Sequence, residues 1–176
     1  MNRAGFTLIE VMIAAVVMAG AVLGLAALIP TITLQTEMAR ESNVAMAAVN
    51  QITEAIRQYA DDDFLYVLRA YNNDPSDDPN GSGSAPGNTF TVSAPPDYLY
   101  DQYGSAQVGT VTFYLDETAT APRVGLPGAD LDGDPLTDSP DISTTYALLP
   151  FTVSVDWKSR NGTVRHVEVS SQVVDY

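Results

Sequence analysis

The sequence contains no cysteine and only one histidine among its 176 residues. The absence of cysteine excludes disulfides, thiolate zinc sites, iron–sulfur clusters, a cysteine nucleophile and a lipidated cysteine anchor. The single histidine, His166, excludes a histidine-rich metal site and argues against a Ser-His-Asp triad. Basic residues are also scarce, with 8 Lys and Arg against 22 Asp and Glu, so the basic surface of a nucleic-acid-binding protein is missing.

Motifs of common enzymes are missing as well. The chain has no nucleophile elbow, phosphate-binding loop or HExxH sequence, so the residues do not predict an enzyme. A length of 176 residues fits roughly one domain. We therefore expect a structural or binding protein without a cofactor, with calcium as the one candidate exception.

The apolar residues are concentrated near the N-terminus. Residues 6–29 read FTLIEVMIAAVVMAGAVLGLAALI and carry one charge, Glu10. A helix of this length spans roughly 36 Å and can cross a hydrocarbon core of ~30 Å. The block is also longer than the apolar part of a cleaved secretory signal, which is usually ~7–15 residues. Arg3 precedes the block, so the positive-inside rule predicts a cytoplasmic N-terminus and an exported C-terminus.

A second helical pattern follows Pro30, which we expect to kink one long helix rather than end it. Apolar residues within 31–60 recur at helical spacing. They form one stripe: Met38, Ala45, Val49, Ile52, Ile56 and Tyr59. Three acids, Asp61 to Asp63, disfavour further helix because negative charge is unfavourable at a helix C-terminus.

Beyond residue 60 the pattern changes to strands separated by acidic loops. Residues 90–92 and 108–115 alternate as strands, and residues 151–157 and 163–174 predict a hairpin. The expected fold class is therefore α+β, with a long N-terminal helical spine packed on a C-terminal antiparallel sheet.

The register of the hairpin follows from its apolar face. A three-residue loop, with Gly162 in the left-handed conformation, keeps the apolar residues on one face, whereas a two-residue turn mixes the faces. The predicted pairs are Phe151 with Ser171, Val153 with Val169, Val155 with Val167, and Trp157 with Arg165. We expect this face to pack on the helical stripe. His166 then lies on the other face, opposite Asp156, as a surface partner rather than a catalytic base or ligand.

The most specific motif is MNRAGFTLIE at the start of the chain. A short basic leader ends in Gly5, Phe6 follows, and Glu10 is the fifth residue after the glycine. Together with the apolar helix to about Ala27, this stretch resembles the signal of type IV pilins and type II secretion pseudopilins. The resemblance implies that a prepilin peptidase cleaves between Gly5 and Phe6 and methylates the new Phe6 amine.

Glu10 has a physical role to fill in this setting. A carboxylate at mid-bilayer costs roughly 2.5–3.5 kcal/mol on insertion scales, so it needs a partner. The resemblance implies that this partner is the methylated amine of a neighbouring subunit. Gly20 and Gly24 form a G-x-x-x-G step that permits close helix packing. With Pro30, they also make this stretch the easiest to unwind in a filament.

The resemblance also implies a domain organisation and a location. It divides the chain into a leader (1–5), a transmembrane and assembly helix (6–30), an amphipathic continuation (31–60) and a β-rich head with acidic loops (61–176). The stretch VVMAGAVLGLAALIP and the closing hairpin are most similar to PilV-type minor pilins, with type II secretion minor pseudopilins as close competitors. The resemblance implies that the partners of the protein are inner-membrane lipid, the peptidase and other pilins or pseudopilins. The resemblance implies that the subunit primes, caps or joins a pilus or pseudopilus at the cell surface.

Two further interpretations remain open. In one, the pilin stalk displays an adhesion or ligand-binding module whose anchors are Tyr98, Tyr100, Tyr103 and Tyr114. In the other, an acidic loop binds calcium through Asp130, Asp132, Asp134 and Asp138. That run resembles the loops of thrombospondin type 3 repeats, although Pro135 stands where those loops usually have glycine. The alternative to calcium is a solvated acidic loop.

Overall fold

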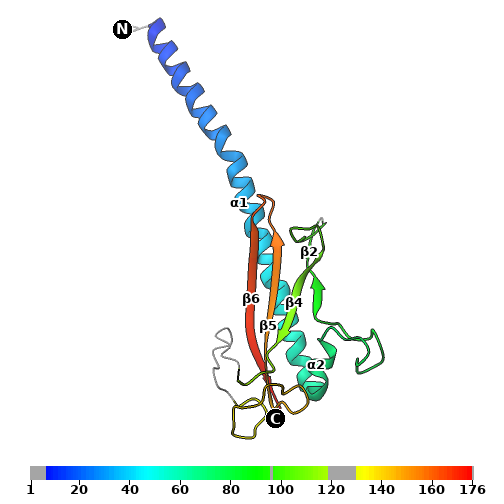
Figure 1. Ribbon diagram of the computed structural model, residues 1–176. Helices are drawn as coiled ribbons and strands as arrows, with labels where there is room; N and C mark the ends of the chain where they lie inside the picture. Colours follow the sequence, from blue (N-terminus) through cyan, green and yellow to red (C-terminus); the bar gives the residue numbers. More distant parts are fainter. Residues whose placement is uncertain (1–6, 96, 119–129, 176) are drawn as a thin grey trace. The chain divides into compact units, whose positions relative to one another are not determined.

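The computed structural model describes residues 7–95, 97–118 and 130–175. The chain divides into two units, Met1–Arg40 and Glu41–Tyr176. Helix α1, Leu8–Asp63, begins in the first unit and ends in the second (Figure 1). Antiparallel strands follow it, so the α+β class predicted from the sequence is confirmed.

In the first unit, α1 continues through Pro30 without a break, as predicted. A proline has no backbone N–H and removes one hydrogen bond of the helix. Thr33 Oγ1 donates to the carbonyl of Ile29 at 3.0 Å, and Thr36 Oγ1 donates to the carbonyl of Ile32 at 2.9 Å. These internal bonds satisfy the two hydroxyls within the helix, so neither needs water or a neighbouring polar group.

In the second unit, one face of α1 is buried. Ala45, Val49, Thr53 and Ile56 line this face at the helical spacing that the sequence predicts for most of them. Thr53 is the polar member, and its Oγ1 donates to the carbonyl of Val49 at 2.9 Å. After Asp63 the chain forms a short 3₁₀ helix, η1 (Phe64–Tyr66), and a single turn, α2 (Val67–Ala70).

The main sheet has four strands in the order β1-β4-β5-β6. Their bounds are Thr89–Thr91, Gln107–Phe113, Leu148–Lys158 and Val164–Val174, and neighbouring strands are antiparallel. A separate two-stranded ribbon joins β2 (Ser93–Ala94) to β3 (Asp97–Tyr98). Strand β5 is the centre of the main sheet, because it pairs along much of its length with both β4 and β6 (Figure 1).

The β5–β6 hairpin has the predicted register. Val153 pairs with Val169 and Asp156 pairs with His166. Gly162 has φ +85°, the left-handed conformation that a three-residue loop needs. The loop closes through Ser159 N to the carbonyl of Thr163 at 2.9 Å and through Gly162 N to the carbonyl of Ser159 at 2.8 Å.

The core of the second unit lies between the sheet and its part of α1. On β5, every second side chain is at most 1% exposed: Phe151, Val153, Val155 and Trp157. They belong to one apolar cluster with Ala45, Val49 and Ile56 of α1, so the predicted packing of hairpin on helix is confirmed within this unit. Full burial of such an aliphatic or aromatic side chain stabilises the fold by roughly 1.5–3 kcal/mol.

A polar contact fastens the tip of the hairpin to the helix inside this unit. The Glu41 carboxylate accepts hydrogen bonds from Trp157 Nε1 at 3.3 Å and from Ser159 Oγ. Ser159 is only 3% exposed, so its hydroxyl has little access to water. Glu41 thereby satisfies two buried donors that the packing of the hairpin would otherwise leave without a partner.

Candidate functional site

The first turn of α1 holds the acidic residue that the sequence analysis singled out. Thr7 N and Thr7 Oγ1 both donate to Glu10 Oε2, at 2.8 and 2.9 Å. In return, Glu10 N lies 3.4 Å from Thr7 Oγ1. This reciprocal arrangement is a capping box, and Thr-x-x-Glu is its sequence signature. Thr7 and Glu10 carry this signature in the sequence, so Glu10 has a partner inside its own helix in addition to the predicted intermolecular one.

The cap determines where the carboxylate of Glu10 points. Both bonds from Thr7 end on Oε2, so the carboxylate is turned back toward the start of the helix, and Oε1 is outside this pair of bonds. An acid in the first turn also interacts favourably with the positive end of the helix dipole. The geometry therefore suits Glu10 both to begin the helix and to present one oxygen to an outside donor.

The remaining predicted assembly residues lie along the exposed helix. A side chain at Gly20 or Gly24 would meet nothing within 4 Å, so both positions are open, one turn apart. Pro30 lies inside α1. Gly5 and Phe6, the predicted cleavage site, lie outside the described residues, and their role stays a prediction.

Large apolar side chains are uncovered throughout this part of α1. Every one from Leu8 to Leu34 is at least 45% exposed. Among the described residues, the helix that begins at Leu8 is the one long and apolar enough to cross a membrane. Such a surface is unfavourable in water and favourable in lipid or against other apolar helices.

A capped, uncovered apolar helix with a single acid in its first turn is consistent with a membrane anchor. Residues 1–28 match the family model described as the prokaryotic N-terminal methylation motif. The chain therefore carries a prepilin signal, which supports a precursor of the type IV pilin or pseudopilin kind. Comparison with curated proteins and with solved structures finds no match to this chain.

The motif also bears on partners and location. It points to a structural subunit and implies processing by a prepilin peptidase and assembly with other pilins. The signal and the exposed apolar helix are both consistent with anchoring in a membrane before assembly.

The acidic loop brings two of its four predicted calcium ligands together. Oxygens of Asp130 and Asp132 lie within 4.8 Å of one another and of Glu117, which precedes the loop. Glu117 is 3% exposed, and its Oε1 accepts from Leu131 N at 2.6 Å and from Asp132 N at 3.2 Å. Its Oε2 accepts from Ser139 N at 3.2 Å. These three backbone donors satisfy the carboxyl oxygens of the buried Glu117.

The other two predicted ligands do not belong to this group of described residues. Asp134 Oδ1 instead accepts from Leu136 N at 2.8 Å, as a turn-forming residue does. Glu117 lies outside the Asp-x-Asp-Gly-Asp spacing, so no local pattern could have shown that it joins the loop. Calcium binding stays a prediction, with Glu117 as an added candidate ligand.

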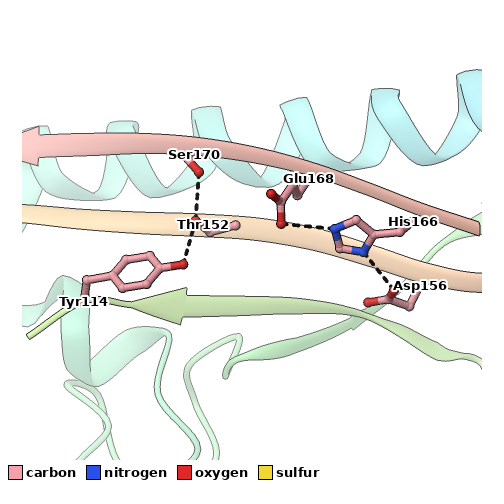
Figure 2. Close-up of polar contacts among 6 residues, drawn as sticks. All are labelled: Tyr114, Thr152, Asp156, His166, Glu168 and Ser170. Atoms are coloured by element: carbon pink, nitrogen blue, oxygen red, sulfur yellow. Dashed lines mark hydrogen bonds and ion pairs between the residues drawn. The ribbon is translucent and has the colours of Figure 1, made fainter. Parts of the chain in front are cut away.

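On the outer face of the sheet, His166 lies between two carboxylates (Figure 2). Its Nδ1 is 2.8 Å from Asp156 Oδ1, and its Nε2 is 3.0 Å from Glu168 Oε2. The hydrogen bond to Asp156, aided by the one to Glu168, raises the pKa of His166 above its usual value despite partial burial. His166 is thus the cross-strand surface partner of Asp156 that the register predicted.

The four tyrosines of the alternative interpretation fall into two groups. Tyr98, Tyr100 and Tyr103 expose their rings on β3 and the loop that follows it. Tyr114 is half-buried, and its hydroxyl lies 3.2 Å from Thr152 Oγ1, which in turn lies 3.0 Å from Ser170 Oγ (Figure 2). Tyr114 follows β4 and its hydroxyl contacts Thr152 of the sheet, whereas Tyr98, Tyr100 and Tyr103 are exposed to a ligand.

Proposed function

We propose that this protein is a minor subunit of a type IV pilus or of a related secretion pseudopilus, with a PilV-type minor pilin as the preferred assignment. It is held in the inner membrane by α1 and then joins the filament through the same helix. The observation that carries this proposal is the uncovered apolar part of α1 with Glu10 capped at its start.

The membrane and the filament each cover the apolar surface of α1, one before assembly and the other after it. Before assembly, lipid covers the apolar side chains; afterwards, the helices of neighbouring subunits do so, with Gly20 and Gly24 permitting close approach. In both environments the carboxylate of Glu10 is the group with a high free-energy cost, because its surroundings are apolar. A methylated amine from a neighbouring subunit neutralises its charge, which also fixes the axial position of one subunit against the next.

Processing is tested by intact-mass measurement on membrane-extracted protein. We expect the mature chain to have lost residues 1–5 and gained one methyl group at Phe6. Gly5→Ala should leave the full-length precursor in the membrane, and Asn2→Ala is the matched control inside the leader. Normal processing of the Gly5→Ala protein would contradict the assigned cleavage site.

Assembly is tested at Glu10. Glu10→Gln keeps an oxygen that can accept the bonds from Thr7 but removes the charge, so it separates capping from intermolecular pairing. We expect the variant to insert and be cleaved normally, yet to be depleted at least about tenfold from sheared filaments, which corresponds to the loss of about 1.4 kcal/mol of subunit pairing. Glu37→Gln, on the same helix outside the apolar block, should assemble like the wild type. Undiminished incorporation of Glu10→Gln would refute the role.

A minor role predicts low abundance. Quantification of purified filaments should show this subunit far below the principal subunit, and its deletion should change filament number more than filament composition. A filament built chiefly from this chain would identify it as a major subunit instead.

A further inference from the structure

A short rigid turn after β3 holds Tyr103 out into solvent. Asp101 Oδ1 accepts hydrogen bonds from Tyr103 N and Ser105 N, both at 2.8 Å. The backbone closes the turn as well, through Asp101 N to the carbonyl of Ser105 at 2.9 Å and Gly104 N to the carbonyl of Asp101 at 3.3 Å. The result is a fixed backbone that carries a tyrosine side chain at 86% exposure.

This turn is attached to the end of the hairpin. Lys158 is the last residue of β5, and its backbone N–H donates to the carbonyl of Tyr100 at 2.8 Å. An open pocket of about 290 Å³ lies between the two segments. It is lined by Asp101, Gln102, Tyr103, Asp156, Trp157 and Val164.

The lining has a clear chemical character. It combines the exposed Tyr103 and the apolar residues Trp157 and Val164 with Asp101, Gln102 and Asp156, and Asp156 Oδ1 also lies 2.8 Å from His166 Nδ1. These six residues, all within the described part of the chain, include no basic side chain. Lys158, Arg160 and Arg165 are close in sequence, but none of them lines the pocket.

We propose that this pocket receives a basic side chain, an arginine or a lysine, from a partner polypeptide. A cation over the face of an aromatic ring gains about 0.5–1 kcal/mol at an exposed site. Carboxylates next to the ring add charge-assisted hydrogen bonds to the same cation. The net charge of −14 attracts a basic partner at long range, and Asp101 uses Oδ1 to hold the turn while Oδ2 takes no part in those bonds.

The inference does not depend on filament assembly, because every residue of the pocket belongs to Glu41–Tyr176. A saccharide is the main competing occupant, since aromatic rings next to Asp and Gln also suit sugars. The acidic residues favour the charged ligand, which would bind beside Asp101 and share Asp156 with His166, and the experiment separates the two.

Trp157 provides the signal, because it is the single tryptophan of the chain and, although only 1% exposed, is one of the six residues around the pocket. The full chain, in a non-ionic detergent without a sugar headgroup, is titrated with acetyl-Gly-Gly-Arg-Gly-Gly-amide while Trp157 fluorescence is recorded. The lysine peptide is a second probe, and the citrulline peptide is the uncharged control of nearly equal shape. Sodium chloride keeps the ionic strength constant, and maltotriose is the saccharide probe.

We expect a saturable change with the arginine and lysine peptides and none with the citrulline peptide or maltotriose. Tyr103→Ala should weaken binding about two- to fivefold, since the ring is exposed and its removal leaves the fold intact. Asp156→Asn should weaken it as well, whereas Tyr98→Ala, a neighbouring exposed tyrosine outside the pocket, should not. The proposal fails if neither basic peptide gives a saturable change at about 50 mM, well above a millimolar dissociation constant. It also fails if citrulline or maltotriose binds equally well, or if Tyr103→Ala binds like the wild type.

Discussion

Substitution of Gly109 by alanine is a sharp test of how the sheet is packed. Gly109 in β4 pairs with Phe90 in β1. An added Cβ would lie 2.3 Å from Phe90 Cε2, 2.4 Å from Cζ and 2.5 Å from Cδ2. The aromatic ring therefore fills the space in which any other residue at position 109 has its Cβ.

The expected cost follows from this overlap. Ordinary contacts of a Cβ begin at 3.4 Å, so the ring must retreat by about 1 Å or rotate away from the sheet. Overpacking of this kind costs about 1–3 kcal/mol. For a chain of 176 residues, each kcal/mol lowers the unfolding temperature by about 2–4 °C, which predicts a drop of about 2–12 °C.

A double-mutant cycle isolates the contact. Thermal unfolding of the full chain in detergent is compared for the wild type, Gly109→Ala, Phe90→Ala and the double variant. Because Phe90→Ala removes the obstacle, the double variant should be clearly more stable than the sum of the single losses predicts. Additive losses, or a Gly109→Ala change below about 0.5 kcal/mol, would refute the assigned pairing of β1 with β4.

Three further outcomes are expected. His166 has a pKa raised above 6.5, so its stabilising contribution is complete below about pH 6.5 and is lost as the pH rises through the raised value. The unfolding-temperature difference between wild type and His166→Gln should therefore be larger at about pH 5.5 than at about pH 8.5, and equal differences would contradict the contact with Asp156. Glu41→Ala leaves the buried Trp157 Nε1–H without its acceptor and should lower the free energy of unfolding by about 1–3 kcal/mol. Denaturant unfolding followed by tryptophan fluorescence measures this change, and an unchanged free energy of unfolding would exclude the anchoring role of Glu41. The calcium hypothesis predicts heat of binding in calorimetry that Asp132→Asn weakens, and it is abandoned if millimolar calcium gives no heat.

The parts of the fold that the sequence predicts are those governed by local alternation. A shift of one residue in the hairpin would pair Val155 with Glu168 and mix the faces, so the alternation on both strands and the loop at Gly162 set the register. The helix across Pro30 was predictable for a similar reason, since apolar residues continue on both sides of it. Strand β5 nevertheless begins at Leu148, earlier than the predicted residue 151.

The contacts that escaped prediction join residues distant in sequence or depend on loop geometry. Glu117 reaches Ser139 across 22 positions, and no periodic pattern encodes that distance. The turn that displays Tyr103 is built by one side chain, Asp101, whose role depends on backbone positions that the sequence does not show. The tyrosines were recognised as candidate anchors, but only the structure separates the exposed Tyr103 from the sheet-bound Tyr114.

The continuity of α1 from Leu8 to Asp63 has a mechanical consequence. Tension applied to the N-terminal part of α1 would reach Ala45, Val49 and Ile56 through the helix backbone, and their side chains pack in one apolar cluster with those of the sheet. Because those contacts are loaded in shear along the helix axis, many of them must yield together, and Glu41 adds a polar fastening at the first residue of that stretch. In the proposed filament, a pull on the apolar part of α1 would therefore load the contacts between helix and sheet.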